Sequence, residues 1–338
     1  MSEQRIVVIG ASAGGLAALR SLISRLGRNF PAPVLVVMHV CAERRSMLPV
    51  ILTRAGDVPA VHAADGDRLA PGRILVAPPG FHLIVRSSSV CLSVGPKENG
   101  FRPSVDVVFR SAACAYGEGA IGVVLSGALD DGASGLYAIK RLGGIAIVQD
   151  PDEAEYASMP FTALQKTTVD RVAGAAEIGR LLNELIQTPP TASPADEHTQ
   201  AYRKQLEKEV SISATDSAFH MGIMDYAEPT RYTCPSCHGV LFKIAEGDAV
   251  RFRCHTGHGF TLASLMQEHR VHLEDKLWQG VMSLQESIAL FEDAAERLEA
   301  AGDASGATDM RAKAEEAKEH ADNLRRLTLR ESRQSSED

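Results

Sequence analysis

The chain has 338 residues, enough for about two domains, because single hydrophobic cores usually stop growing above about 250–300 residues. Hydrophobic residues make up 45% and charged residues 23%, which excludes a wholly disordered or fibrous chain. The formal net charge of -8 gives no overall electrostatic reason to expect nucleic acid as a partner, and the absence of a long apolar segment or a leader-like N-terminus predicts a cytoplasmic protein.

Apolar runs alternate with helical patterns from residue 5 to about residue 185. The runs read "RIVVIG", "PVLVVMHV", "RILVAP", "AIGVVLSG" and "GIAIVQD". Strands so continuously apolar are buried on both faces, which predicts a doubly wound, mainly parallel sheet between two layers of helices. A more polar pair, "FHLIVRSS" and "SVCLSVGP", favours a hairpin. We therefore expect a three-layer α/β/α domain over residues 1–187.

The first apolar run leads into "GASAGG", which resembles two glycine motifs. Gly10, Ser12 and Gly14 match G-x-S-x-G, the turn that exposes a nucleophilic serine. The dinucleotide fingerprint G-x-G-x-x-G is matched only with Ser12 in place of its middle glycine, where a side chain obstructs the pyrophosphate. The second strand favours the nucleophile turn, because it ends in His39, where a nicotinamide fold needs Asp or Glu for the ribose hydroxyls.

A later strand, in "AIGVVLSGALDDG", carries Asp130 and Asp131 on the turn that follows it. In an open parallel sheet, groups at the carboxyl ends of strands gather at one edge, so either acid can orient His39 while Ser12 attacks. Each residue alone also has an ordinary explanation, as a helix cap, a strand-end histidine or a turn residue. Together they predict a serine hydrolase without a catalytic cofactor. The rival hypotheses are a dinucleotide-binding protein and a non-catalytic scaffold that keeps the fold.

Residues 188–228 have the composition of a linker and include a short helical segment, "YRKQLEKEV". Cysteines and histidines then cluster in "YTCPSCHG" and "RFRCHTGHGF", within residues 229–261. A C-x-x-C pair followed by a second ligand pair predicts a closed, tetrahedral structural zinc site that stabilises a zinc-ribbon-like module. His238 and His255 are competing ligands. The predicted ligands are Cys234, Cys237, Cys254 and His258.

Apolar residues keep a helical spacing from Leu262 to Leu298, and a second helix follows the break at "AGDASG". This pattern predicts a helical hairpin over residues 262–330, with a frayed tail at 331–338. The charged outer face is typical of a solvated surface. We expect the hairpin to serve self-association or partner binding.

Six ordered blocks in the first domain resemble the chemotaxis protein-glutamate methylesterases (CheB-type). The blocks read "VVIGASAGG", "VVMH", "DGDRLAPGRILVAPPGFHL", "FRPSVDVVFRSAA", "GVVLSGALDDGASGL" and "GGIAIVQDPDEAEYASMP". The resemblance implies hydrolysis of glutamate methyl esters on a chemoreceptor-type protein, with release of methanol and a side activity in glutamine deamidation. It implies that Ser12 is the nucleophile, His39 the base and Asp131 the orienting acid, with Asp130 the runner-up.

Two departures from the family pattern bear on these expectations. The family usually has T-G-M-G before the aspartate, whereas this chain has "SGAL", residues 126–129. The change is expected to reshape the oxyanion side of the pocket, where backbone N–H groups after Ser12 and at Ala128 are the expected donors. The two-domain form of the family places a receiver domain before the esterase, and Ser12 lies too near the N-terminus for one. We therefore expect a stand-alone esterase with a C-terminal zinc-ribbon and helical extension, as certain relatives carry.

Overall fold

The structure is a computed structural model that describes residues 4–40, 46–190, 196–215, 217–247 and 249–334. The chain divides into two compact units, Met1–Leu265 and Met266–Asp338. None of the helices in the described part of the chain has the length and apolarity needed to cross a bilayer.

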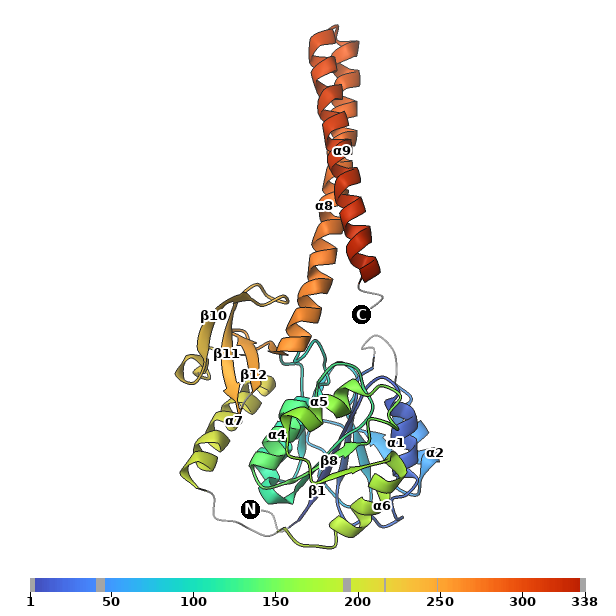
Figure 1. Ribbon diagram of the computed structural model, residues 1–338, viewed down its shortest axis with the longest axis vertical. Coiled ribbons are helices and arrows are strands. Elements are labelled where there is room, and N and C mark those ends of the chain that lie inside the picture. The colour runs from blue at the N-terminus through green and yellow to red at the C-terminus, as the bar shows by residue number, and fades with distance from the viewer. Residues whose placement is uncertain (1–3, 41–45, 191–195, 216, 248, 335–338) are drawn as a thin grey trace. The chain divides into compact units, whose positions relative to one another are not determined.

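Across the described residues, the first unit is built on a parallel sheet flanked by helices (Figure 1). Its seven strands have the order β3-β4-β2-β1-β7-β8-β9. Every residue of the central strand β1 is buried, as a strand covered on both faces requires. The predicted parallel sheet is confirmed. The strands are β1 (Ile6–Ala11), β2 (Val34–Met38), β3 (Ala60–His62), β4 (Ile74–Val76), β7 (Ala120–Val124), β8 (Ile145–Gln149) and β9 (Arg171–Ala173).

Helices cover both faces of this sheet, which confirms the three-layer fold. One hydrophobic core lies between the sheet and α1 (Gly15–Ile23), α2 (Leu48–Ala55) and α6 (Ala175–Leu185). The core on the opposite face includes residues of α3 (Val105–Tyr116), α4 (Ala133–Arg141) and α5 (Ser158–Lys166). The predicted hairpin is present as β5 (His82–Val85) paired antiparallel with β6 (Val90–Ser93).

The chain continues into a helix and a second, antiparallel sheet that belong to the same compact unit. The helix α7 (Glu197–Thr215) extends well beyond the short segment expected from the sequence, and its buried Leu206 joins the core on the α3 face. The second sheet pairs β10, β11, β12 and β13 in that order, and we call it the four-stranded module. Its strands are β10 (Glu228–Thr233), β11 (Val240–Glu246), β12 (Ala249–Cys254) and β13 (Gly259–Thr261).

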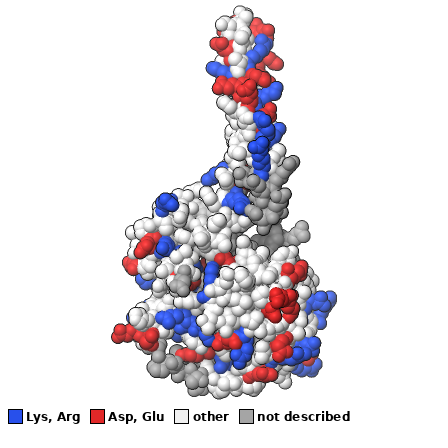
Figure 2. All heavy atoms as spheres, in the orientation of Figure 1, with Lys and Arg blue, Asp and Glu red and all other residues white. Residues whose placement is uncertain are grey.

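The second unit contains two long helices, α8 (Leu262–Ala300), which begins at the end of the first unit, and α9 (Ala304–Gln334). A turn with a positive φ of 84° at Gly302 reverses the chain between them. Gly280 of α8 faces Leu324 of α9, so the two helices pack side by side. Basic and acidic side chains are interspersed along the viewed face of this hairpin (Figure 2).

Candidate active site

Three residues singled out from the sequence follow three neighbouring strands of the parallel sheet. Ser12 comes directly after β1, and His39 directly after β2. Asp131 lies on the turn after β7, which pairs with the other side of β1. Because Ala11 pairs with Met38 and Gly10 with Val124, the ends of these strands lie level with one another. The three side chains therefore meet at the carboxyl edge of the sheet, where open α/β folds place their functional groups.

The imidazole of His39 lies between the other two side chains. Its Nδ1 is 3.0 Å from Ser12 Oγ, and its Nε2 is 2.7 Å from Asp131 Oδ2. An ionised carboxylate can only accept hydrogen bonds, so the nitrogen that faces Asp131, Nε2, carries the proton. The lone pair of Nδ1 then faces Ser12. The Phe101 ring stacks on the imidazole with a centroid separation of 3.7 Å and an interplanar angle of 5°. These contacts hold His39 in the orientation that a general base needs.

The glycines around Ser12 let neighbouring segments pack directly against β1 and let the chain turn sharply into α1. A Cβ on Gly10 would lie 2.1 Å from Val105 Cγ1, so glycine lets the start of α3 pack directly against β1. Gly14 caps α1 with a φ of 68°, a conformation that glycine adopts without strain. The N–H of Ser12 donates to Ser126 O at 2.9 Å and is therefore engaged within the fold. This turn presents the Ser12 hydroxyl rather than a bare backbone.

Asp131 is surrounded by hydrogen-bond donors. Burial alone would raise the pKa of Asp131, but the hydrogen bond and charge of His39, together with backbone and amide N–H groups, lower it below its usual value. The carboxylate therefore stays ionised and can stabilise an imidazolium. The donors are His39 Nε2 (2.7 Å), Val105 N (2.7 Å), Asn99 Nδ2 (2.9 Å), Ser104 Oγ (2.9 Å) and Asp106 N (3.2 Å).

A second buried carboxyl group, Asp106, lies beside Asp131. Burial and then the charge of Asp131 raise the pKa of Asp106 to about 8. Asn99 Nδ2 donates to Asp106 Oδ2 at 2.9 Å and so links the two carboxyl groups. The raised pKa of Asp106 and the lowered pKa of Asp131 favour placing the negative charge of this pair on Asp131, next to His39.

The runner-up acid, Asp130, points to other partners. Its Oδ2 accepts from Lys166 Nζ at 3.1 Å, and its Oδ1 accepts from Thr261 Oγ1 at 2.8 Å. The structure therefore brings Asp131, and not Asp130, to His39.

Asn99 and Phe101 contact the site but were not among the residues predicted from the sequence. They belong to a tight turn in which Asn99 has a φ of 54° and Gly100 a φ of 83°. The Asn-Gly dipeptide is a turn signal that the sequence does contain. Nothing in that signal indicates contacts with His39 or Asp131.

The segment that departs from the family pattern follows β7. Gly127 is required there, because a Cβ would lie 2.0 Å from Met159 Sδ and 2.9 Å from Ser12 Cβ. Leu129 has a φ of 61°, which is strained for a leucine. Ala128 is exposed, and its role as an oxyanion donor stays a prediction.

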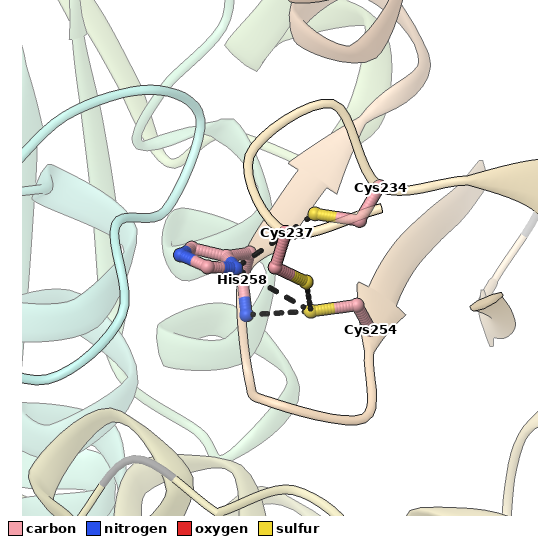
Figure 3. A group of neighbouring side chains, drawn as sticks. All are labelled: Cys234, Cys237, Cys254 and His258. Atoms are coloured by element: carbon pink, nitrogen blue, oxygen red, sulfur yellow. Dashed lines mark hydrogen bonds between the residues drawn. The ribbon is translucent and has the colours of Figure 1, made fainter. Parts of the chain in front are cut away.

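The four predicted metal ligands form one group in the four-stranded module (Figure 3). The ligand atoms of Cys234, Cys237, Cys254 and His258 all lie within 4.8 Å of one another. Cys237 Sγ is 3.6 Å from Cys254 Sγ, and His258 Nδ1 is 3.5 Å from Cys254 Sγ. Zn–S bonds of about 2.3 Å in a tetrahedron place sulfurs roughly 3.8 Å apart. The spacing therefore fits a tetrahedral metal ion. The competing histidines, His238 and His255, are outside the group formed by the described residues.

Comparisons with known proteins match the first part of the chain. The family model described as CheB methylesterase matches residues 7–182, more than half of the chain. A protein-glutamate methylesterase/protein-glutamine glutaminase 2 of Anaeromyxobacter dehalogenans is 41% identical over 180 residues, which are 53% of each chain. A Leptospira interrogans protein that carries this name provisionally is 38% identical over 182 residues, 54% of this chain and 94% of that protein. The crystal structure of the Thermotoga maritima CheB methylesterase catalytic domain matches with a TM-score of 0.53 and 34% identity, over 55% of this chain and 100% of that one.

Proposed function

This chain belongs to the CheB methylesterase family, and from that membership we propose that it is a serine esterase that hydrolyses glutamate methyl esters on a protein. Ser12 is the nucleophile, His39 the general base and Asp131 the orienting acid. The observation that carries these roles is the position of His39 between Ser12 Oγ and the Asp131 carboxylate. The membership supports neither the dinucleotide-binding protein nor the non-catalytic scaffold.

The first half of the reaction forms a covalent ester. Nδ1 of His39 takes the Ser12 proton as Oγ attacks the ester carbonyl, and the negative charge moves to the carbonyl oxygen. The N–H of Ser12 donates to Ser126 O and the N–H of Gly15 donates to Ser12 O, so the N–H groups of Ala13 and Gly14, just before α1, are the candidates to bind that oxygen. The intermediate collapses when His39 returns the proton to the leaving methoxide, which departs as methanol.

The second half regenerates the enzyme. Water attacks the glutamyl-serine ester while His39 removes a proton from it, and the Ser12 oxygen leaves with that proton. The product is a glutamate carboxyl group. A glutamine side chain can follow the same route with ammonia as the leaving group, which is the glutaminase activity in the relatives' names.

Two measurements test this proposal. Wild-type protein should release methanol from a methylated receptor preparation and should be labelled at Ser12 by a serine-directed phosphonate. Ser12→Ala should abolish both, and Ser24→Ala, which removes an exposed hydroxyl at the end of α1, should leave both unchanged. A wild-type protein that folds but releases no methanol would contradict the substrate assignment.

We also propose that the four-stranded module binds one structural zinc ion through Cys234, Cys237, Cys254 and His258. Four protein ligands close the coordination shell, so the metal stabilises the module and takes no part in ester hydrolysis. The support is the spacing of the ligand atoms, all within 4.8 Å. Elemental analysis should find one zinc per chain and less in Cys254→Ser, while Cys114→Ser, a change in α3, should keep its zinc.

The substrate we propose is a chemoreceptor or a related signalling protein, and the compartment is the cytoplasm. Both follow from the family rather than from a feature of the pocket. For the helical hairpin we propose self-association or partner binding, because Met282 and Leu290 of α8 are 65% and 63% exposed. Sedimentation of the full chain should show more than one chain per particle if the hairpin self-associates.

A further inference from the structure

The turn that carries Asn99 lies between the catalytic residues and the four-stranded module. We propose that Asn99 is a positioning residue for the His39–Asp131 pair, and that the four-stranded module completes the active site by holding Asn99 in place. The inference rests on the proposed function, because it takes Ser12 as the nucleophile. It goes beyond the family comparison, because the family match ends at residue 182, before the module begins.

The backbone of this turn is joined to the module. Glu98 N donates to Phe101 O at 3.1 Å and Phe101 N donates to Glu98 O at 2.9 Å, which closes the turn. On its outer side, Asn99 N donates to Gly259 O at 2.8 Å, and Gly259 N donates to Lys97 O at 3.2 Å. Gly259 is the first residue of β13, so the turn is hydrogen-bonded to an edge of the module.

The Asn99 side chain uses all of its hydrogen-bonding groups. Its two N–H groups donate to Asp131 Oδ1 and Asp106 Oδ2, both at 2.9 Å. Its carbonyl oxygen accepts from Thr261 N and Ser264 Oγ, both at 3.0 Å. Asn99 is 4% exposed, and a rotated amide would place its N–H groups against the donors Thr261 N of β13 and Ser264 Oγ at the start of α8. The last strand of the module and the start of α8 therefore determine which side of the Asn99 amide is turned toward Asp131.

The same turn also supports the catalytic base. Phe101, two residues after Asn99, is the residue whose ring stacks on His39 at 3.7 Å. A displacement of the turn therefore shifts two side chains at once: Asn99, which donates to Asp131, and Phe101, which stacks on His39. Misplacements of about 1 Å in an active site cost up to roughly 100-fold in rate.

Buried charges fix the module against the α/β domain. Glu98, at the start of the turn, is 2% exposed and pairs with Arg110 of α3 and, at 2.9 Å, with Arg253 of β12. Arg251 of β12 in turn pairs with Glu209 of α7 at 2.8 Å. Buried charges are tolerated only in geometries that satisfy them, so this cluster admits few docking arrangements of the module. The turn is therefore held in place by α3 on one side and by β12 on the other.

The variant Asn99→Ala tests the role of the side chain in the full-length protein. We expect the rate of Ser12 phosphonylation, and kcat for ester hydrolysis, to fall roughly 10- to 100-fold with little change in KM, because Asn99 is buried and its amide groups are already hydrogen-bonded within the fold. Losing a donor also raises the pKa of Asp131, so the acidic limb of the rate–pH profile should move to higher pH. A purely structural role would not move that limb.

Two further variants make the test specific. Ser264→Ala leaves Asn99 intact but removes one of the two donors that orient it, and should slow phosphonylation by roughly 3-fold. Thr230→Val, a matched control, breaks hydrogen bonds within β10 and β11 and should label at the wild-type rate. Ser264→Ala also keeps the test decisive if Asn99→Ala folds poorly.

The inference is overturned if Asn99→Ala and Ser264→Ala label Ser12 as fast as the wild type, or if the rate of Asn99→Ala falls with an unmoved pH profile. Failure of the proposed function would give a different experimental result. If the wild type is labelled at Ser12 but releases no methanol from methylated receptors, the substrate is wrong. The ratio of labelling rates between the variants and the wild type still decides for or against Asn99.

Discussion

The substitution Asp131→Asn keeps the shape of the orienting side chain but replaces one acceptor oxygen with an NH2 group. In the place of Oδ1, that group would face the N–H donors of Asn99 and Asp106. In the place of Oδ2, it would face Val105 N and His39 Nε2. Only the second arrangement can adapt, because His39 can move its proton from Nε2 to Nδ1. We therefore expect the NH2 group at Oδ2 and the other tautomer of His39.

The altered tautomer removes the base. Nδ1 then carries a proton and points an N–H at Ser12 Oγ, which lies 3.0 Å away. Loss of the correct tautomer in serine triads lowers kcat by about 10⁴-fold, or about 5 kcal/mol of transition-state stabilisation. The Val105 N–H, left facing another donor, should also lower the free energy of unfolding by about 1–3 kcal/mol.

Methanol release at saturating methylated receptor measures this effect, with urea unfolding to confirm that the variant is folded. Asp130→Asn is the matched control, because it changes the neighbouring carboxylate, which has no contact with His39. Its kcat for methanol release should fall by less than about 3-fold. The reasoning is refuted if Asp131→Asn keeps more than about a tenth of the wild-type kcat, or if Asp130→Asn is the more damaged variant.

Removing the proposed zinc ion by chelation, or by Cys254→Ser, should lower the melting temperature and slow ester hydrolysis, because β13 begins directly after the proposed ligand His258. Circular dichroism and methanol release that both stay unchanged would contradict this. Burial opposes ionisation of Glu209, but Arg251 and its neighbours lower the pKa of Glu209 from the usual 4.5 to about 2. Its contribution to stability is therefore present above pH 4.5 and is lost as the pH falls toward 2, and Glu209→Gln should flatten that part of the pH dependence in urea unfolding. Leu129→Gly should change the unfolding free energy by less than about 0.5 kcal/mol, because relief of about 1 kcal/mol of backbone strain offsets the entropy of glycine; a loss above about 2 kcal/mol would show that the leucine side chain packs.

Much of the α/β domain can be predicted from the sequence, because strands buried on both faces are continuous apolar runs. The positions of Ser12 and His39 follow from the same pattern, since each ends one of these runs. The choice between Asp130 and Asp131 does not follow from periodicity. It depends on which carboxylate the turn after β7 directs toward His39, and only the resemblance to a family favoured Asp131.

The environment of Asn99 could not be predicted from the sequence. Its partners Thr261 and Ser264 lie more than 150 residues further along the chain, and no local pattern indicates that the module docks there. The extent of α7 was underestimated for a related reason. Its polar composition is typical of a linker, and buried contacts such as those of Leu206 and Glu209 depend on the surfaces that they meet.

The most direct test of the account is methanol release from a methylated receptor preparation by the wild type and by Ser12→Ala, with phosphonate labelling of the same samples. We predict methanol release and labelling at Ser12 in the wild type and neither in the variant. A wild-type protein that releases methanol at the same rate as Ser12→Ala would contradict it.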